Sequence, residues 1–294
     1  MHADGAVSSF AGHSFAGHSR LAVRAGRALG VVFLTLVAIS CLFPVAWMVS
    51  TSLKNQSEVY ISKSFWPAHP EWSNYVRAWQ EAHLGVYFAN SLLYLTVVVS
   101  LTLLIGSLAA YGLSRLEMPG RAAIYNTIVA SLMVPLPAAF VPVYVILLQL
   151  HLIDTRAGYV LPLIAGGLPL SIFVLKGFFD QTPRELEEAA IMDGANKWCL
   201  YSRIVMPLAR PALATILILT SLSAWNDYLL ALVILTSQRL MPVQVGLMVF
   251  QGTYFTRYEM LMAGTTIALA PIALLYILAQ KQIIGGLSAG ALKG

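Results

Sequence analysis

Residues 186–211, LEEAAIMDGANKWCLYSRIVMPLARP, form a charged, helix-forming stretch in a chain that otherwise consists mostly of long apolar runs. The stretch is too polar to cross a bilayer, because charged side chains are costly in hydrocarbon. Its pattern is also too regular for an unstructured loop. We therefore expect a structured segment outside the lipid, whose shape is needed for an interaction there.

The rest of the chain has the composition of a helical membrane protein. Of its 294 residues, 58% are hydrophobic and 11% are charged, and the mean hydropathy is +0.74. A bilayer core about 30 Å thick requires about 20 helical residues to cross it. Six apolar runs approach or exceed this length, and they leave little chain for a soluble domain. The runs are 29–50, 86–113, 122–150, 157–175, 212–235 and 260–280.

The runs divide the chain into three parts. We predict a flexible cytoplasmic tail at 1–28, a six-helix transmembrane domain at 29–285 that includes a cytoplasmic segment at 182–207, and a cytoplasmic tail at 286–294. The first part does not resemble a cleaved signal, because it lacks a charged start followed by a short apolar core. Its doubled unit FAGHSFAGHS is typical of a flexible tract without a specific ligand.

The basic residues predict the orientation of the chain. If the N-terminus is cytoplasmic, twelve of the eighteen Lys and Arg residues fall on the cytoplasmic side. Short loops rich in Lys and Arg stay in the cytoplasm. Both termini and segment 182–207 are therefore expected there. The net charge of +5 reflects this bias, and no basic patch interleaved with aromatic residues indicates a nucleic-acid partner.

Motifs for catalysis are missing from the sequence. It contains no G-x-x-x-x-G-K-[ST], H-E-x-x-H, G-x-S-x-G or C-x-x-C motif, and Cys41 and Cys199 have no metal-ligand spacing. Asp227 is the only carboxylate within the six runs. Carriers driven by ion gradients usually place several charged groups along their pathway. We therefore expect no catalysis, cofactor or metal in this chain, and an energy source outside the membrane.

Local signals predict a helix, a turn and a second helix within 182–207. Thr182 is a candidate N-cap, with Pro183 at the first helical position and Glu185 three residues after the cap. Gly194 can end this helix in a left-handed conformation. Asn196 is then the expected cap of a second short helix.

The same residues resemble a known family. They match the pattern E-A-A-x-x-x-G-x9-I-x-L-P of permease subunits in binding-protein-dependent ATP-binding cassette (ABC) importers, with Met206 in place of the leucine. The matching residues are Glu188, Ala189, Ala190, Gly194, Ile204 and Pro207. Two further segments, SAWNDYLLAL at 223–232 and QKQIIGGLSAGALKG at 280–294, are similar to the carbohydrate branch. Within that branch, they are similar to the second, maltose-type permease with six membrane helices.

The resemblance implies a fold and a set of partners. It implies an all-α, six-helix type I permease in a bacterial or archaeal plasma membrane, paired with a second, different permease. Its other partners would be a cytoplasmic ATPase dimer, which holds the ATP and Mg, and an extracytoplasmic sugar-binding protein. A permease for glycerol phosphate or another polyol is the alternative within the family. A secondary carrier acting alone is the alternative from another class.

In this family the matching loop is a coupling helix that docks in a groove of the ATPase, and the C-terminal tail reaches towards the ATPase. The implied coupling residues are Glu188, Ala189, Ala190, Asp193, Gly194, Ile204 and Pro207. The implied tail residues are Gly286, Leu287, Gly290 and Gly294. For Glu188 alone, a solvated surface acid is the simpler alternative.

Two groups of residues are candidates for the substrate pathway. Trp225, Asn226, Asp227 and Tyr228 combine aromatic faces with polar groups that suit a sugar, although the aromatics could be interfacial anchors and Asp227 a structural cap. Prolines and glycines interrupt the third, fourth and sixth runs, where they indicate either a pathway or packing kinks. These residues are Pro135, Pro137, Pro142, Pro162, Gly166, Gly167, Pro169 and Pro271.

Overall fold

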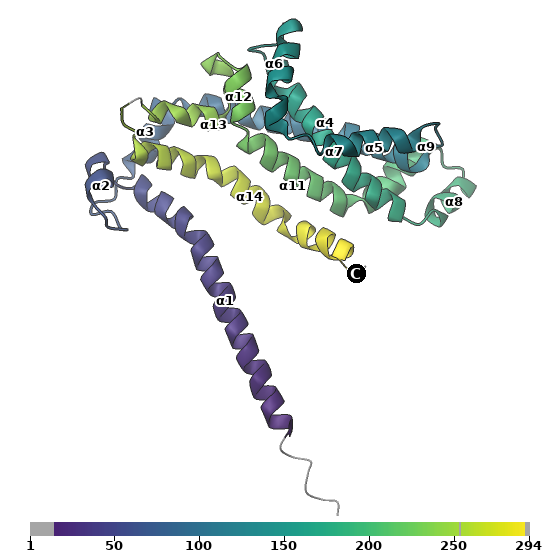
Figure 1. The fold of residues 1–294 in the computed structure, drawn as a ribbon, viewed down its shortest axis with the longest axis horizontal. Helices are drawn as coiled ribbons and strands as arrows, with labels where there is room; N and C mark the ends of the chain where they lie inside the picture. Colours follow the sequence, from purple (N-terminus) through teal and green to yellow (C-terminus); the bar gives the residue numbers. More distant parts are fainter. Residues whose placement is uncertain (1–14, 253, 292–294) are drawn as a thin grey trace, which may run out of the picture.

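The computed structural model describes residues 15–252 and 254–291, and Figure 1 shows their arrangement. These residues form helices and connecting turns but no β-strand, and a single isolated antiparallel bridge pairs Gln251 with Thr256. Long helices α4, α7, α11 and α14 lie along one another in a bundle, whereas α1 extends away from it (Figure 1).

The helices of the first half are α1 (Phe15–Ser52), α2 (Gln56–Ile61), α3 (Ser73–Glu81), α4 (Leu84–Arg115), α5 (Arg121–Ser131), η1 (Leu136–Ala139), α6 (Phe140–Gln149) and α7 (Arg156–Gln181). Those of the second half are α8 (Glu185–Met192), α9 (Lys197–Cys199), η2 (Leu200–Val205), α10 (Met206–Leu208), α11 (Arg210–Asn226), α12 (Leu229–Ile234), η3 (Gln238–Leu240), α13 (Val243–Gly246), η4 (Leu247–Phe250) and α14 (Tyr258–Ala291). The short helices α2 and α3 lie at one end of the bundle and α8 and α9 at the other, whereas α6 and α12 project from the bundle between these ends (Figure 1).

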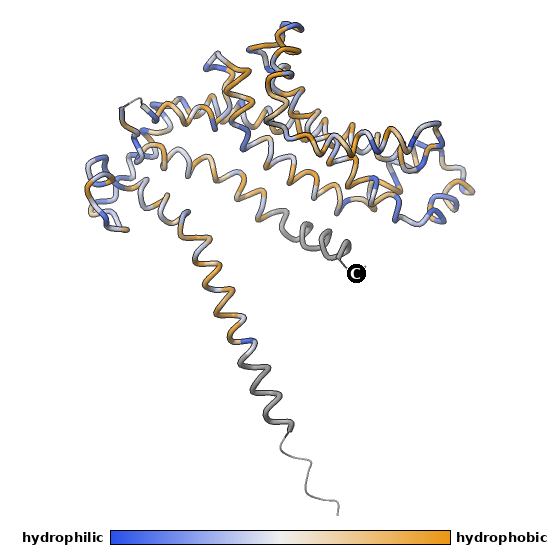
Figure 2. Tube along the Cα trace, in the orientation of Figure 1, coloured by the Kyte–Doolittle hydropathy of each residue, from blue (hydrophilic) through white to orange (hydrophobic). Residues whose placement is uncertain are grey.

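Four stretches in the described residues are long and apolar enough to cross a membrane: Gly26–Ser52, Leu84–Arg115, Arg156–Gln181 and Tyr258–Ile277. A fifth candidate is the pair Lys197–Leu208 and Arg210–Asn226, which is bent by 75°. Hydrophobic residues dominate these helices, and hydrophilic residues gather at the turns (Figure 2). The predicted all-α membrane fold is confirmed.

Two of the six predicted spans are not single helices. The third run divides into α5, η1 and α6, and the break contains Pro135. A proline favours such a break because it has no N–H to donate and disfavours the helical conformation of the residue before it. The fifth run divides into α11 and α12, because the backbone of Asp227 is extended.

In two other runs the prolines do not break the helix, and a packing kink stays the prediction there. α7 continues through Pro162 and Pro169, and α14 continues through Pro271. Membrane helices tolerate proline where neighbouring groups satisfy the freed backbone carbonyl. The pathway interpretation of these three prolines depended on a broken helix, and the helices are continuous at these positions.

The bundle is held by close contacts between α4, α7, α11 and α14. A Cβ added to Gly106 of α4 would lie 2.2 Å from Ser171 Oγ of α7, so a glycine is needed for this approach. The rings of Tyr94 and Tyr159 meet edge to face at 4.8 Å between centroids. These contacts place the turns at the two ends of the bundle in fixed positions relative to each other.

Helix α1 has a different environment from the other spans. Helix α1 begins at Phe15, within the segment predicted as a tail. In the most apolar part of its span Gly26–Ser52, no residue is buried by the rest of the chain. Leu29 and Phe33 are among its exposed apolar side chains. A bare apolar helix of this length is expected to lie in lipid or against another membrane subunit.

Candidate functional site

The predicted coupling segment forms a short helix outside the spans, between α7 and α11. Helix α8 begins at Glu185, and the Arg184 carbonyl accepts the N–H groups of Glu187 and Glu188, both at 2.9 Å. The predicted start at Pro183 with a Thr182 cap is wrong. The Thr182 hydroxyl instead donates to the Phe178 carbonyl, at 3.2 Å, and closes the end of α7.

The end of α8 forms as the sequence predicts. Gly194 has φ +84°, and its N–H donates to the Ile191 carbonyl at 2.9 Å. The next N–H, of Ala195, donates to the Ala190 carbonyl, also at 2.9 Å. This pair of bonds is the Schellman arrangement, and it satisfies carbonyls that the end of a helix leaves free. Asp193 lies at the C-cap and is exposed.

The second half of the segment is anchored to α4. The Asn196 side chain accepts the Cys199 N–H at 2.8 Å, which confirms the predicted second cap. A wide helical stretch, η2, then carries Tyr201, whose hydroxyl lies 2.8 Å from the hydroxyl of Ser107 on α4. Ile204 is half-buried, and Pro207 lies in α10 just before the bend into α11.

A buried ion pair that sequence reasoning missed joins α8 to α4. Arg115 Nε lies 2.5 Å from Glu187 Oε1, and the two side chains are only 8% and 9% exposed. The Arg115 guanidinium also donates to the Ser114 hydroxyl at 2.9 Å and to the Thr182 carbonyl at 3.2 Å. The Glu187 carboxylate neutralises the Arg115 charge, and Ser114 and Thr182 accept two of its other N–H groups. The pair therefore holds α8 against the end of α4.

The outer face of α8 is left open by the described residues. Glu188 and Ala189 are exposed, whereas Ala190 is half-buried. Large apolar side chains flank them, with Met192 88% exposed and Leu186 and Ile191 about half exposed. Exposed apolar side chains next to an acid are typical of a surface that another protein covers.

The second candidate cluster lies at the break between α11 and α12. Trp225 is buried, and its indole N–H donates to the Ala268 carbonyl at 3.0 Å. Asp227 accepts the Tyr159 hydroxyl at 3.0 Å and the Ala231 N–H at 3.1 Å. Both side chains therefore make structural contacts, and Asp227 satisfies a backbone donor in the first turn of α12.

Asn226 and Tyr228 lie on the more open side of this break. Asn226 is exposed, and its side chain donates to the Leu222 carbonyl at 3.0 Å. Tyr228 lines an open cavity of about 460 Å³ together with Gln244, Gln251 and Thr265. The four candidates at 225–228 thus have different surroundings: Trp225 and Asp227 make contacts within the bundle, Asn226 is exposed, and Tyr228 lines the cavity.

The remaining sequence candidates fall in different places. Pro135 is exposed at the break between α5 and η1, and Pro137 lies within η1. Gly286, Leu287 and Gly290 belong to the last turns of α14, and Gly294 lies outside the described residues. Pro135 and Pro137 thus belong to other elements than the residues at 188–194.

Asp227 provides a test of the structural contacts at the break. Asp227→Leu should lower the melting temperature of the detergent-purified chain, because it leaves the Tyr159 hydroxyl and the Ala231 N–H without their acceptor. An unsatisfied buried donor costs about 1–3 kcal/mol. Asn226→Leu, at the adjacent exposed position, should melt close to wild type. Equal melting of wild type and Asp227→Leu would show that Asp227 does not stabilise the break.

An all-helical bundle of apolar spans with a capped helix outside them defines a multi-pass membrane protein. The chain belongs to the family described as binding-protein-dependent transport system inner membrane components, whose model matches residues 102–283. The family predicted from the residues at 188–207 is confirmed. As a member, the chain is a permease subunit of a transporter and not an enzyme.

Relatives whose names state a transport function match almost the whole chain. The diacetylchitobiose uptake system permease protein NgcG of Streptomyces coelicolor is 32% identical over 268 residues, which are 90% of this chain and 89% of that protein. The trehalose/maltose transport system permease protein MalG of Thermococcus litoralis is 33% identical over 271 residues, 91% of this chain and 97% of that protein.

A solved structure has the same fold. It is a chain from a bacterial ABC transporter involved in the import of the acidic polysaccharide alginate, with a TM-score of 0.78 and 24% identity. The match covers 94% of this chain and 100% of that chain. The likeness supports the fold assignment.

Proposed function

We propose that this chain is a permease subunit of an ATP-driven sugar importer and forms half of its translocation pathway together with a second, different permease. Sugar-uptake permeases are 32% and 33% identical to it over about nine-tenths of its length. The single observation that supports the coupling role is the form of helix α8. It is a short helix with a firmly closed end and an exposed face of small, apolar and acidic side chains.

Helix α8 is the element through which we propose that a cytoplasmic ATPase dimer acts. ATP and Mg would bind to that partner. A displacement of α8 would reach α4 through the Arg115–Glu187 pair, because a buried, hydrogen-bonded pair resists separation. The contact between Tyr201 and Ser107 would couple the second half of the segment to the same helix. The bundle would then rotate as a rigid body relative to the second permease, which is a common form of conformational change at an interface between subunits.

The proposed orientation places α8 and both termini in the cytoplasm of a bacterial or archaeal cell, with the chain in the plasma membrane. It rests on the excess of Lys and Arg on that side of the spans. The end of α14, including Gly286 and Leu287, would then point towards the ATPase side. In a chain without its native cysteines, a cysteine at Ala195 should react with an impermeant reagent only after permeabilisation. Reaction in intact cells would reverse the orientation.

A neutral saccharide suits the cavity at the α11–α12 break better than a phosphorylated polyol. Amide groups at Gln244 and Gln251 offer donors and acceptors for sugar hydroxyls. The hydroxyls of Tyr228 and Thr265 donate to Met248 and to the Leu261 carbonyl, so their oxygens add acceptors. Apolar side chains complete the wall, as in many ligand sites. The cavity is lined by no charged side chain, whereas a phosphate would require a cation. Delivery by an extracytoplasmic sugar-binding protein completes the proposal.

Uptake measurements test the substrate class. Cells that express this chain with the subunits and binding protein encoded beside it should accumulate one of a panel of labelled di- and oligosaccharides. Glycerol phosphate should neither accumulate nor compete with that sugar. The melting temperature of the isolated binding protein should rise with the same sugar. Accumulation of glycerol phosphate instead would replace the sugar proposal with its alternative.

A further inference from the structure

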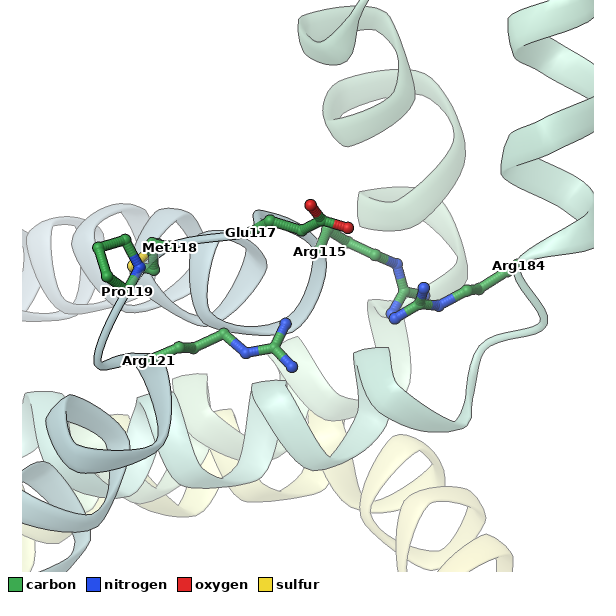
Figure 3. A pocket seen from close by; sticks show the side chains of 6 residues that line it. All are labelled: Arg115, Glu117, Met118, Pro119, Arg121 and Arg184. Atoms are coloured by element: carbon green, nitrogen blue, oxygen red, sulfur yellow. The ribbon is translucent and has the colours of Figure 1, made fainter.

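A basic pocket lies where α4 ends and α5 begins, next to the approach to α8. Its volume is about 600 Å³, and three arginine side chains from separate segments reach towards its interior (Figure 3). The residues that line it are Arg115, Glu117, Met118, Pro119, Arg121 and Arg184. The proposed transport function assigns no role to this pocket.

The three arginines are placed by different parts of the fold. Arg115 is the last residue of α4 and is fixed by its bonds to Glu187, Ser114 and Thr182. Arg121 is the first residue of α5, directly after a left-handed turn at Gly120, where φ is +75°. Arg115 is therefore preorganised, and the turn directs Arg121 towards the same space.

The charges around the pocket do not balance. Asp180, which accepts the Ser114 hydroxyl at 2.6 Å next to Arg115, is itself matched by Lys176 at 2.5 Å, so this pair leaves the balance unchanged. Within the part of the chain that the structure describes, neither Arg121 nor Arg184 is within salt-bridge distance of a carboxylate. Counting Glu117 in the pocket and Glu187 behind it, three cations face two carboxylates. Like charges repel across a shared cavity. One additional negative charge would balance the group.

A phosphodiester matches this requirement, since it carries one negative charge and oxygens that arginine binds in a bidentate manner. The location indicates where the phosphodiester comes from. The apolar span Leu84–Arg115 ends at the pocket, and Arg156–Gln181 ends just before Arg184. The pocket therefore lies at the level of the lipid headgroups in either orientation of the chain. Basic pockets between membrane helices are typical sites for anionic headgroups.

The surface next to the pocket is suited to acyl chains. Helix α5 leads away from Arg121, contributes no buried residue, and exposes Ile124. Leu132, at its C-terminal end, is also exposed. We propose that the pocket binds the headgroup of an anionic phospholipid, with Arg121 and Arg184 contacting the phosphodiester beside the preorganised Arg115, and with an acyl chain along α5.

Native mass spectrometry of the full-length, detergent-purified chain tests this proposal. With equal amounts of phosphatidylglycerol and phosphatidylcholine, wild type should retain phosphatidylglycerol preferentially. The double variant R121Q/R184Q should reduce that retention by about tenfold or more, because two charge-assisted contacts are lost. Its melting temperature without added lipid should match wild type, which separates lost binding from lost folding.

The matched control removes two other arginines. R203Q/R210Q changes the net charge by the same amount at exposed positions outside the pocket, so it should retain phosphatidylglycerol like wild type. Equal losses in both double variants, or unchanged retention in R121Q/R184Q, would overturn the proposal. Displacement of the lipid by millimolar inorganic phosphate would also overturn it and would assign the pocket to a soluble anion. Loss of a copurifying protein with lipid retention unchanged would assign it to an acidic protein partner.

Discussion

Replacing Glu187 with alanine is expected to lower the free energy of unfolding by about 3–5 kcal/mol, because it leaves the buried Arg115 charge without its carboxylate. Arg115 Nε and Glu187 Oε1 are 2.5 Å apart, and the two side chains are only 8% and 9% exposed, so the loss of the carboxylate leaves a largely buried charge. The variant should melt well below wild type in detergent, and transport should fall with the amount of folded protein.

Two further variants separate the charge from the packing. Glu188→Ala removes the same charge from the next position of α8, where the side chain is exposed, and should change stability by less than about 0.5 kcal/mol. The double variant Arg115→Met with Glu187→Leu should recover most of the lost stability, since it leaves no isolated charge. A wild-type melting temperature for Glu187→Ala would mean that α8 is not held to α4 by this pair.

Replacing Gly194 with proline is expected to abolish uptake while the chain still inserts in the membrane. Proline requires φ near −65°, whereas Gly194 has φ +84°, and proline has no N–H to donate to the Ile191 carbonyl. The end of α8 must therefore rearrange, although no span is touched. Uptake should fall to the background of cells without the permease at matched expression.

Gly194→Ala and Gly177→Ala are the graded controls for this prediction. Alanine at Gly194 retains the N–H and costs about 1–2 kcal/mol in the left-handed region, so uptake should be reduced but not lost. Gly177 lies within α7, its φ is not in the left-handed region, and a Cβ there would contact nothing within 4 Å. Gly177→Ala should transport like wild type. Normal uptake by Gly194→Pro would show that coupling does not depend on the shape of this turn.

Much of the architecture could be predicted because its causes are local. Long apolar runs predict membrane helices, and the glycine at 194 and the asparagine at 196 predict a turn and a cap from a few neighbouring residues. These signals depend on backbone geometry that only a few residue types satisfy. The prediction failed at Thr182, where the same hydroxyl can cap a following helix or bond back to a preceding one. The fold selects the second option.

The contacts that link distant segments could not be predicted in the same way. Glu187 and Glu188 are adjacent and chemically identical, yet one is buried against Arg115, 72 positions away in the sequence, and the other is exposed. Asp227 was open to several roles until its neighbours Tyr159 and Ala231 were known. The positions of proline breaks were equally ambiguous. Pro135 lies at a break, whereas Pro162 and Pro271 lie in continuous helices.

The central claim is that α8 transmits the action of an ATPase to the membrane bundle. The most direct test is ATP hydrolysis by the importer in proteoliposomes, assembled from the chain, the second permease and the ATPase dimer. The rate is measured with and without sugar-loaded binding protein, for wild type and for Glu188→Lys at matched content. Reversing this exposed charge removes a contact worth about 1.5–3 kcal/mol, so Glu188→Lys should assemble but show little stimulation. Stimulation equal to wild type in Glu188→Lys, or transport by wild type that continues without ATP, would contradict the account.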